Sequence, residues 1–481
     1  MMPHDLVLKG GQVATPEGVI LADVAVTDGR VAAIGPDLDG AEQIDASGRL
    51  VLPGGVDPHA HIEQMSGMGL MNADDFESAT RSAALGGTTT VISFAAQAKG
   101  QSLRATIADY AARAARGAAI DHAFHLTITD LSVPGFAEDL AALIAAGHHS
   151  VKLFTTYNIG LTDAAILEVM AQVKAAGGLV CVHAENDGLI GWTKAKLLAA
   201  GLDRPEHHAL SHPRLAEVEA LERMCRFAEF FDQPVMLFHI STAEGVGVVR
   251  AAKARGAPVW AETCTHYLLQ TAEVLQRQGV EGAKWMCSPP QRAQADQEAL
   301  WDGVQTGVIA LVSSDHAPYR FDASGKLLAG EAPAFDKIAN GLPGLETRLP
   351  LLFDAMVTKG RGGLSGFVKA TAEHPAEVYG LAGKGRIALG ADADLVVWNP
   401  ARQVTYGADD LADNVGYNPW EGHQVTGWPE EVVLAGKTIV RGGAFLGQPG
   451  GGKWLPRFGG AARALGNPSP EYAYLQHKGA L

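Results

Sequence analysis

Cysteine is scarce in this sequence. Its 481 residues contain four cysteines, at positions 181, 225, 264 and 287. They lie far apart and form no CxxC pair, which argues against a disulfide framework. Three of them fall within apolar, strand-like runs. We therefore expect reduced cysteines that pack in the interior of a cytoplasmic protein.

Positive charge and long apolar runs are also in short supply. The chain has 38 Lys and Arg against 53 Asp and Glu, which gives a formal net charge of −15. Nucleic acids and anionic membranes both bind basic patches, so this balance argues against either partner. No uninterrupted apolar run reaches about 18 residues, the length that a membrane-spanning helix needs. The N-terminus also lacks the pattern of a signal peptide, and we expect a cytoplasmic location.

The two ends of the chain share one pattern of apolar and polar residues, and its middle has a different one. Residues 1–54 and 385–446 alternate apolar and polar residues and are cut by glycines, as in GRVAAIG and ADADLVVWNP. This pattern is typical of short antiparallel strands, and we predict that both segments pair into one small β-sandwich domain. Residues 447–481 are dense in Gly and Pro and sustain no helical or strand period, which predicts an extended C-terminal arm.

The middle of the chain, residues 55–384, alternates short apolar runs with alanine-rich amphipathic stretches. Runs that are apolar throughout are typical of parallel strands buried on both faces. Eight such runs occur, at residues 49–61, 88–97, 120–129, 150–157, 179–186, 234–242, 258–265 and 308–318. The pattern predicts an α/β fold with a (β/α)₈ TIM barrel, and a doubly wound open sheet is the alternative.

Side chains that bind metals stand at the ends of these runs, where barrel enzymes build their sites. The first run ends in His59 and His61, which point the same way because residues two apart on a strand share a face. Later runs end in His183, His239 and Asp315. Four histidines and a carboxylate suit Zn²⁺ or a similar ion and exceed one tetrahedral site. We therefore predict two divalent metals that share a bridging ligand.

Lys152 is the candidate for that bridge. It lies in the apolar run SVKLFTTY, where a bare ammonium is costly and would repel metals. One interpretation is a lysine that snorkels or pairs with an acid. The other is a lysine that has reacted with CO₂ to give N6-carboxylysine, an anionic ligand with two oxygens.

This motif set resembles the metal-dependent amidohydrolase superfamily and, within it, the cyclic amidohydrolases of the dihydropyrimidinase and D-hydantoinase type. The matching stretches are GGVDPHAH, ALGGTTTVISF, VKLFTTY, VHAEN, MCSPP, SSDHAPY, KIANGLPGLETR and DNVGYNPWEG. They extend over nearly the whole chain, to about Gly443. The resemblance implies a hydrolase that opens the ring amide bond of hydantoins or dihydropyrimidines with a hydroxide that bridges two Zn²⁺ ions.

The resemblance also implies a role for each candidate residue. One metal would be held by His59, His61 and Asp315, the other by His183 and His239, and both by Lys152 as its carbamate. Asp315 would also take the proton of the hydroxide and pass it to the leaving nitrogen. Tyr157 would donate to the carbonyl oxygen as charge develops there. The main chain at Ser288 and Asn340 would bond the amide and imide atoms of the ring.

Two departures leave the substrate open. Glu63 stands two residues after His61, where the similar dihydroorotases carry an arginine for the substrate carboxylate, so we expect dihydroorotate to be a poor substrate. The stretch AETCTHYLLQ is more like allantoinases and dihydroorotases, although Tyr157 fits the hydantoinase form. An allantoinase-like or other cyclic imide or ureide hydrolase is therefore the alternative. A non-catalytic scaffold of the same fold agrees less well with the complete ligand set.

Other residues are available near the predicted site. The Met- and Gly-rich stretch MSGMGLM, residues 65–71, would line an apolar pocket with Phe154 or merely cover the rim. We expect His266 and His316 to pack beside the ligands, and the pair His207–His208 to be exposed in a loop. Related hydantoinases are tetramers whose C-terminal segments reach across subunits. The resemblance therefore implies a homotetramer, with a dimer as second choice, in which aromatic residues of the arm dock on a neighbour.

Overall fold

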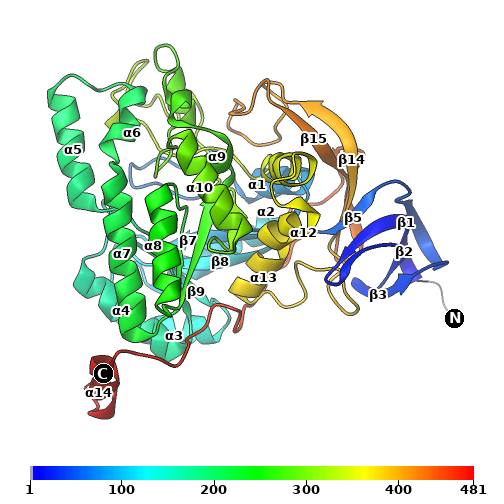
Figure 1. The fold of residues 1–481 in the computed structure, drawn as a ribbon, viewed down its shortest axis with the longest axis horizontal. Coiled ribbons are helices and arrows are strands. Elements are labelled where there is room, and N and C mark those ends of the chain that lie inside the picture. The colour runs from blue at the N-terminus through cyan, green and yellow to red at the C-terminus, as the bar shows by residue number, and fades with distance from the viewer. Residues whose placement is uncertain (1–3, 481) are drawn as a thin grey trace.

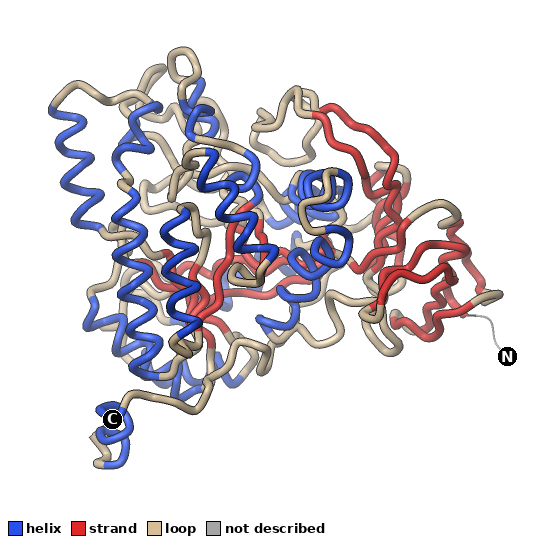
Figure 2. Tube along the Cα trace, in the orientation of Figure 1, coloured by secondary structure: helices blue, strands red, loops and turns tan. Residues whose placement is uncertain are grey.

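The computed structural model describes residues 4–480, which form an eight-stranded barrel and a nine-stranded sheet. Helices surround the barrel on one side of the molecule, and the sheet lies on the other side (Figure 1). Figure 2 shows the strands of the sheet gathered away from the barrel helices. The predicted α/β fold, a barrel with a small β domain built from both chain ends, is confirmed.

The eight barrel strands run parallel in the order β13-β12-β11-β10-β9-β8-β7-β6. They are β6 (Gly55–Ala60), β7 (Thr88–Ala96), β8 (Asp121–Thr127), β9 (Ser150–Phe154), β10 (Leu179–His183), β11 (Val235–Leu237), β12 (Val259–Cys264) and β13 (Leu311–Ser313). A parallel bridge between Ala60 and His316 joins the end of β6 to the segment that follows β13. This bridge nearly closes the barrel, so the doubly wound alternative is wrong.

Every residue of β6, β9 and β10 is buried, as expected for strands covered by helices outside and filled by side chains inside. The helices between the strands start at polar caps. The side chains of Ser102, Thr162 and Asn186 each accept a backbone N–H from the first turn that follows. The helices up to the last strand are α1 (Phe76–Leu85), α2 (Leu103–Gly117), α3 (Phe136–Ala145), α4 (Asp163–Ala176), α5 (Asp187–Ala199), α6 (His208–Ser211), α7 (Arg214–Phe231), α8 (Ala243–Ala254), α9 (Thr265–Leu269) and α10 (Gln294–Gln305).

The segment after β13 returns to the β domain through a helical layer. Its helices are α11 (Arg348–Phe353), α12 (Gly363–Val368) and α13 (His374–Tyr379), joined by the π-helical turns η5 (Asp354–Thr358) and η6 (Lys369–Glu373). Short 3₁₀ helices lie in the loops, at η1 (Pro205–His207), η2 (Ala272–Leu275), η3 (Glu281–Trp285) and η4 (Phe335–Lys337). Several of these loops form the wall of the cavity that is described below.

Both ends of the chain contribute to the second sheet. Its strands are β1 (His4–Thr15), β2 (Gly18–Thr27), β3 (Arg30–Gly35), β4 (Gly40–Asp45), β5 (Leu50–Pro53), β14 (Leu395–Thr405), β15 (Gln424–Leu434), β16 (Lys437–Arg441) and β17 (Ala444–Phe445). Strand β5 pairs in parallel with β1 and antiparallel with β14, so it joins the two ends. A separate apolar core that includes Val24, Leu395 and Val433 holds the domain together.

The C-terminal arm lies against the barrel of its own chain. Trp454 forms a parallel bridge with His122, and the backbone N–H of Arg457 donates to the carbonyl of Gly147. The arm also ends in a helix, α14 (Pro470–His477), which contradicts our expectation of no regular structure (Figure 1). The local signal was present, because Ser469 caps this helix and Pro470 occupies its first turn.

All four cysteines are buried and unpaired, as predicted. Within residues 4–480, no helix combines the length and the apolar character needed to cross a membrane.

Candidate active site

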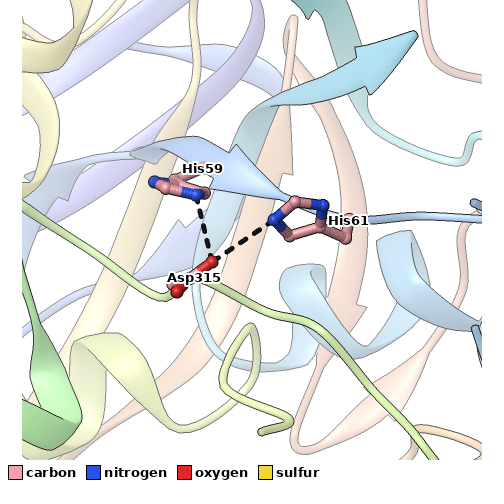
Figure 3. Close-up of side chains that lie close together, drawn as sticks. All are labelled: His59, His61 and Asp315. Carbon is pink, nitrogen blue, oxygen red and sulfur yellow. Dashed lines mark ion pairs between the residues drawn. The ribbon is translucent and has the colours of Figure 1, made fainter. Parts of the chain in front are cut away.

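His59, His61 and Asp315 meet at one end of the barrel. His59 lies on β6, His61 follows that strand, and Asp315 follows β13. Asp315 Oδ1 lies 3.0 Å from His59 Nε2 and 3.4 Å from His61 Nε2 (Figure 3). The ligand atoms of the three residues lie within 4.8 Å of one another. They are therefore close enough to share one metal ion.

Two further side chains orient these imidazoles. Glu262 on β12 is buried, and its Oε1 lies 2.5 Å from His59 Nδ1. Gln64 Oε1 lies 2.8 Å from His61 Nδ1. Each contact occupies Nδ1 and leaves Nε2 directed at Asp315. Outer partners of this kind fix the tautomer and the orientation of metal-binding histidines.

His183 and His239 form a second pair in the same region. His183 ends β10, and its ring centroid lies 4.4 Å from that of His239, which follows β11. Glu185 Oε2 lies 2.8 Å from His183 Nε2, and Glu185 Oε1 accepts from His212 Nδ1 at 2.9 Å. The His239 ring is also 5.6 Å from that of His59, so the two histidine pairs are neighbours.

Lys152 is buried among aromatic rings, with 1% of its surface exposed. Its Nζ lies 4.0 Å from the ring centroid of Phe238 and 4.7 Å from that of Phe154. Among the described residues it forms no ion pair, and burial lowers its pKa to about 8. The interpretation of a lysine that snorkels or pairs with an acid is therefore wrong. An unpaired buried ammonium is costly, which favours a state in which the charge is changed.

Tyr157, Ser288 and Asn340 lie on the wall of the same cavity. Asn340 Nδ2 donates to Ser288 Oγ at 2.9 Å, while the buried Asn340 Oδ1 has no partner in the described part of the chain. Tyr157 is 37% exposed, but desolvation of its hydroxyl in the cavity wall and the nearby Glu185 carboxylate raise its pKa, so the hydroxyl stays protonated at neutral pH. The hydroxyl is therefore available as a hydrogen-bond donor.

The backbone is strained at three of these positions. Tyr157, His239 and Asp315 have φ angles of 68°, 42° and 47°, in the left-handed region that residues other than glycine seldom adopt. Strain of this kind is typically found at functional sites, where the surrounding structure holds it in place. Here it turns the chain at the ends of β9, β11 and β13.

One open cavity of about 400 Å³ contains the site, a volume suited to a small molecule. All nine residues predicted as ligands or substrate contacts line it: His59, His61, Lys152, Tyr157, His183, His239, Ser288, Asp315 and Asn340. Met68 and Phe154 line it as well, as expected. Met65 and Met71 are not part of the lining and are 51% and 41% exposed, so only part of the Met-rich loop faces the cavity.

The structure corrects the interpretation of Glu63. This residue has a φ of 49°, does not line the cavity and lies beside Arg113. Its neighbour Gln64 faces the cavity instead. The alternation of a strand ends before this position, because β6 stops at Ala60. The position of Glu63 therefore gives no support to the expectation that dihydroorotate is a poor substrate.

The expectation of an exposed loop at His207–His208 is wrong for the second residue. His208 begins α6, is buried, and its Nε2 lies 2.7 Å from the carbonyl oxygen of Cys287. His266 and His316 are buried, as expected for packing residues. His316 Nε2 lies 3.0 Å from Asp74 Oδ2, whereas the buried His266 Nε2 has no partner among the described residues.

Sequence reasoning missed the residues that support the ligands. Glu185 and Glu262 are fully buried and each contacts a candidate ligand, His183 or His59. The available signal was an acidic residue inside or just after an apolar run, as in VHAEN and VWAETC. A buried carboxylate needs a partner, so such a position predicts a contact with a cation or an imidazole.

Comparison with known proteins gives one consistent result. The chain is 39% identical over 458 residues to a D-hydantoinase of Ralstonia pickettii, which covers 94% of this chain and 99% of that protein. It is 38% identical to a D-hydantoinase of Geobacillus stearothermophilus, over 94% of this chain and 96% of that protein. The crystal structure of a dihydropyrimidinase from Brevibacillus agri superposes with a TM-score of 0.90 at 36% identity and covers 94% of this chain and 98% of that one. The profile of the amidohydrolase family matches residues 50–439, and the chain belongs to this family.

Proposed function

We propose that the protein is a metal-dependent hydrolase that opens the ring amide bond of hydantoins and dihydropyrimidines. The observation that carries the proposal is the convergence of His59, His61 and Asp315 with the unpaired Lys152 in one cavity. The hydantoinase and dihydropyrimidinase relatives, which match over nearly their whole lengths, support the same substrate class. An allantoinase-like hydrolase of cyclic ureides is the second candidate, because AETCTHYLLQ resembles those enzymes.

The residues present fit a pair of divalent ions, for which we propose Zn²⁺. His59, His61 and Asp315 would hold one ion, and His183 and His239 the other. The fit is tested by Lys152, whose buried ammonium has no ion pair among the described residues. A carbamate on its Nζ would exchange this unpaired charge for an anion that can bind both ions. When bound, the ions supply Lewis-acid polarisation and make water nucleophilic at neutral pH.

The chain's own residues would move the protons. The Asp315 carboxylate can accept a proton from the attacking water and return it to the nitrogen that leaves the ring. The Tyr157 hydroxyl can donate to the carbonyl oxygen, where negative charge develops during attack. Its raised pKa keeps this donor protonated over the neutral range. The two groups therefore serve opposite ends of the amide bond that breaks.

The part of the cavity wall at Ser288 and Asn340 would recognise the ring itself. Ser288 and Asn340 are joined by a side-chain hydrogen bond and line the cavity, so their main-chain groups can bond the remaining amide and imide atoms. Phe154 and Met68 give the cavity an apolar side. We infer that a substituent on the ring lies against these two side chains.

A panel of cyclic amides tests the substrate class. Purified protein loaded with Zn²⁺ should open hydantoin and dihydrouracil, and its turnover of allantoin should be lower. A preference for allantoin would favour the second candidate. Absence of turnover on every ring, with metal bound, would favour a non-catalytic scaffold.

Lys152→Ala tests the carbamate. The variant should lose metal and activity together, and a short-chain carboxylic acid added to it should partly restore both. The mass of the intact, metallated wild type should exceed that of the plain chain by one CO₂ in addition to the bound metals. A free ammonium at Lys152 in fully active protein would contradict the proposal.

We also propose a cytoplasmic homotetramer, with a dimer as second choice. The support is the exposed aromatic surface of the C-terminal arm, where Phe458 and Tyr474 are each 61% exposed. Aromatic residues are favoured at subunit interfaces. Truncation after residue 467 removes α14 with Tyr474 but keeps Arg457, which is buried in the barrel. The truncated chain should form smaller species in light scattering, and an unchanged oligomer would contradict a role for α14.

A further inference from the structure

Lys326 is a second buried lysine without a carboxylate partner. None of its surface is exposed, and it forms no ion pair in the part of the chain that the structure describes. Its Nζ donates to the carbonyl oxygen of Ala339 at 2.9 Å and to that of Met286 at 3.3 Å. An ammonium held only by two carbonyls is a poor way to stabilise a fold, because burial of its charge is costly.

The two carbonyls belong to two loops of the cavity wall, one that contains Ser288 and one that contains Asn340. Met286 lies two residues before Ser288, and Ala339 immediately precedes Asn340. The loops are linked by two other bonds, from Gly341 N to the Met286 carbonyl at 2.8 Å and from Asn340 Nδ2 to Ser288 Oγ at 2.9 Å. Among residues 4–480, Lys326 is the one residue outside both loops whose side chain bonds to both.

The turn before Lys326 fixes the position of this residue. The backbone N–H of Lys326 donates to the Arg320 carbonyl at 2.8 Å, which closes a loop of the chain. At Gly325 a Cβ atom would lie 2.1 Å from that same carbonyl oxygen, closer than any side chain allows. Only glycine therefore fits at this point of the turn. The turn presents Lys326 behind the wall, since its side chain does not line the cavity.

We propose that Lys326 is a positioning residue that holds the two loops at the spacing needed for Ser288 and Asn340 to bond the substrate ring. The inference rests on the proposed function, because that function assigns the ring contacts to these loops. We call the two hydrogen bonds from Lys326 to these loops the clamp. Its loss would misplace the main-chain groups that bind the ring without disturbing the metal ligands. Binding of the substrate would weaken, and the metal content would stay the same.

Lys326→Met tests the clamp, because methionine keeps most of the apolar stem and removes every donor. We expect KM for hydantoin to rise about tenfold or more, the effect of losing roughly one hydrogen bond to the substrate, while metal content is unchanged. The thermal midpoint should move little, because removal of a buried charge offsets the loss of the donor to the Ala339 carbonyl, while the Met286 carbonyl keeps the Gly341 N–H. Lys326→Gln retains an NH₂ donor and should give an intermediate KM.

Lys384→Met is the matched control. Lys384 is also buried, but its Nζ lies 2.6 Å from Asp121 and 2.8 Å from Asp394, away from the cavity lining. Its loss leaves carboxylates unpaired, so the thermal midpoint should fall while KM stays the same. Lys326→Met is thus expected to change KM and not the thermal midpoint, whereas Lys384→Met should change the thermal midpoint and not KM.

A second readout does not depend on turnover. Amide exchange at the peptide that contains Gly341 should be faster in Lys326→Met than in wild type or in Lys384→Met. If neither KM nor this exchange changes in the Met and Gln variants, the clamp is refuted. A wild type that turns over no cyclic amide would defeat the proposed function, and the exchange measurement would still decide on the clamp.

Discussion

Glu346 provides a test of buried electrostatics that is independent of the metals. Its Oε2 accepts from the backbone N–H of Ala412 at 2.8 Å and from Ser82 Oγ at 3.1 Å. The residue is 7% exposed. Burial, with the nearby Asp413 carboxylate, raises its pKa from 4.5 to about 7, against the opposing charge of Arg81. The folded protein therefore holds this proton over much of the range in which the unfolded chain has released it.

The sign of the effect on stability follows from the direction of the shift. The folded-state pKa is above the unfolded value, so the contribution to the free energy of unfolding is fully present below about pH 4.5. It decreases as the pH rises and levels off above about pH 7. A shift from 4.5 to about 7 corresponds to a loss of about 3 kcal/mol. Glu346→Gln keeps the oxygen acceptor, cannot ionise, and should not show this loss.

The assay compares the two proteins across pH, so that all other titrating groups cancel. Denaturant unfolding of wild type and Glu346→Gln should give similar stabilities near pH 4. Near pH 8 the variant should be more stable by about 2 kcal/mol or more. Thermal midpoints should diverge in the same direction. A difference between the two proteins that does not change between pH 4 and pH 8 would refute the reasoning.

Two further predictions concern the site. Tyr157→Phe should lower kcat by about 10²–10³, the usual effect of removing one donor to a developing oxyanion, with metal content unchanged, and near-normal turnover would remove this hydroxyl from the mechanism. Glu262→Ala should weaken metal binding by about 10–100-fold, because His59 loses the partner that orients it. Glu262→Gln keeps an oxygen for His59 Nδ1 and should lose less metal affinity than Glu262→Ala. Equal metal affinity in the wild type and both variants would contradict an orienting role.

The barrel and the convergence of the candidate ligands were predictable because they follow short-range rules. Each barrel strand is a continuous apolar run, and the C-terminal ends of parallel strands meet at one edge. His183 and Asp315 could therefore be assigned to the same site although 132 positions, 315 minus 183, separate them. The pairing of both chain ends followed from their shared alternation, and β5 confirms it by joining β1 to β14.

The errors arose where the direction of a side chain depends on local backbone geometry or on a distant partner. Glu63 follows the end of β6, where the chain has turned into a left-handed conformation, so its side chain does not continue the pattern of His59 and His61. His208 lies in a helix of four residues, too short to show a period in the sequence. Its burial depends on the Cys287 carbonyl, a partner 79 residues away. No local pattern carries that information.

Three buried lysines show most clearly what the sequence leaves undecided. Lys152, Lys326 and Lys384 all stand beside apolar or glycine residues, in SVKLF, SGKLL and AGKGR. In the fold the first faces aromatic rings, the second two carbonyls and the third a group of aspartates. Burial lowers the pKa of the first two, to about 8 and about 7, whereas the aspartates outweigh burial and hold Lys384 charged. The same side chain thus suits carbamate formation, loop positioning or an ion pair, and its partners, which are distant in sequence, determine which.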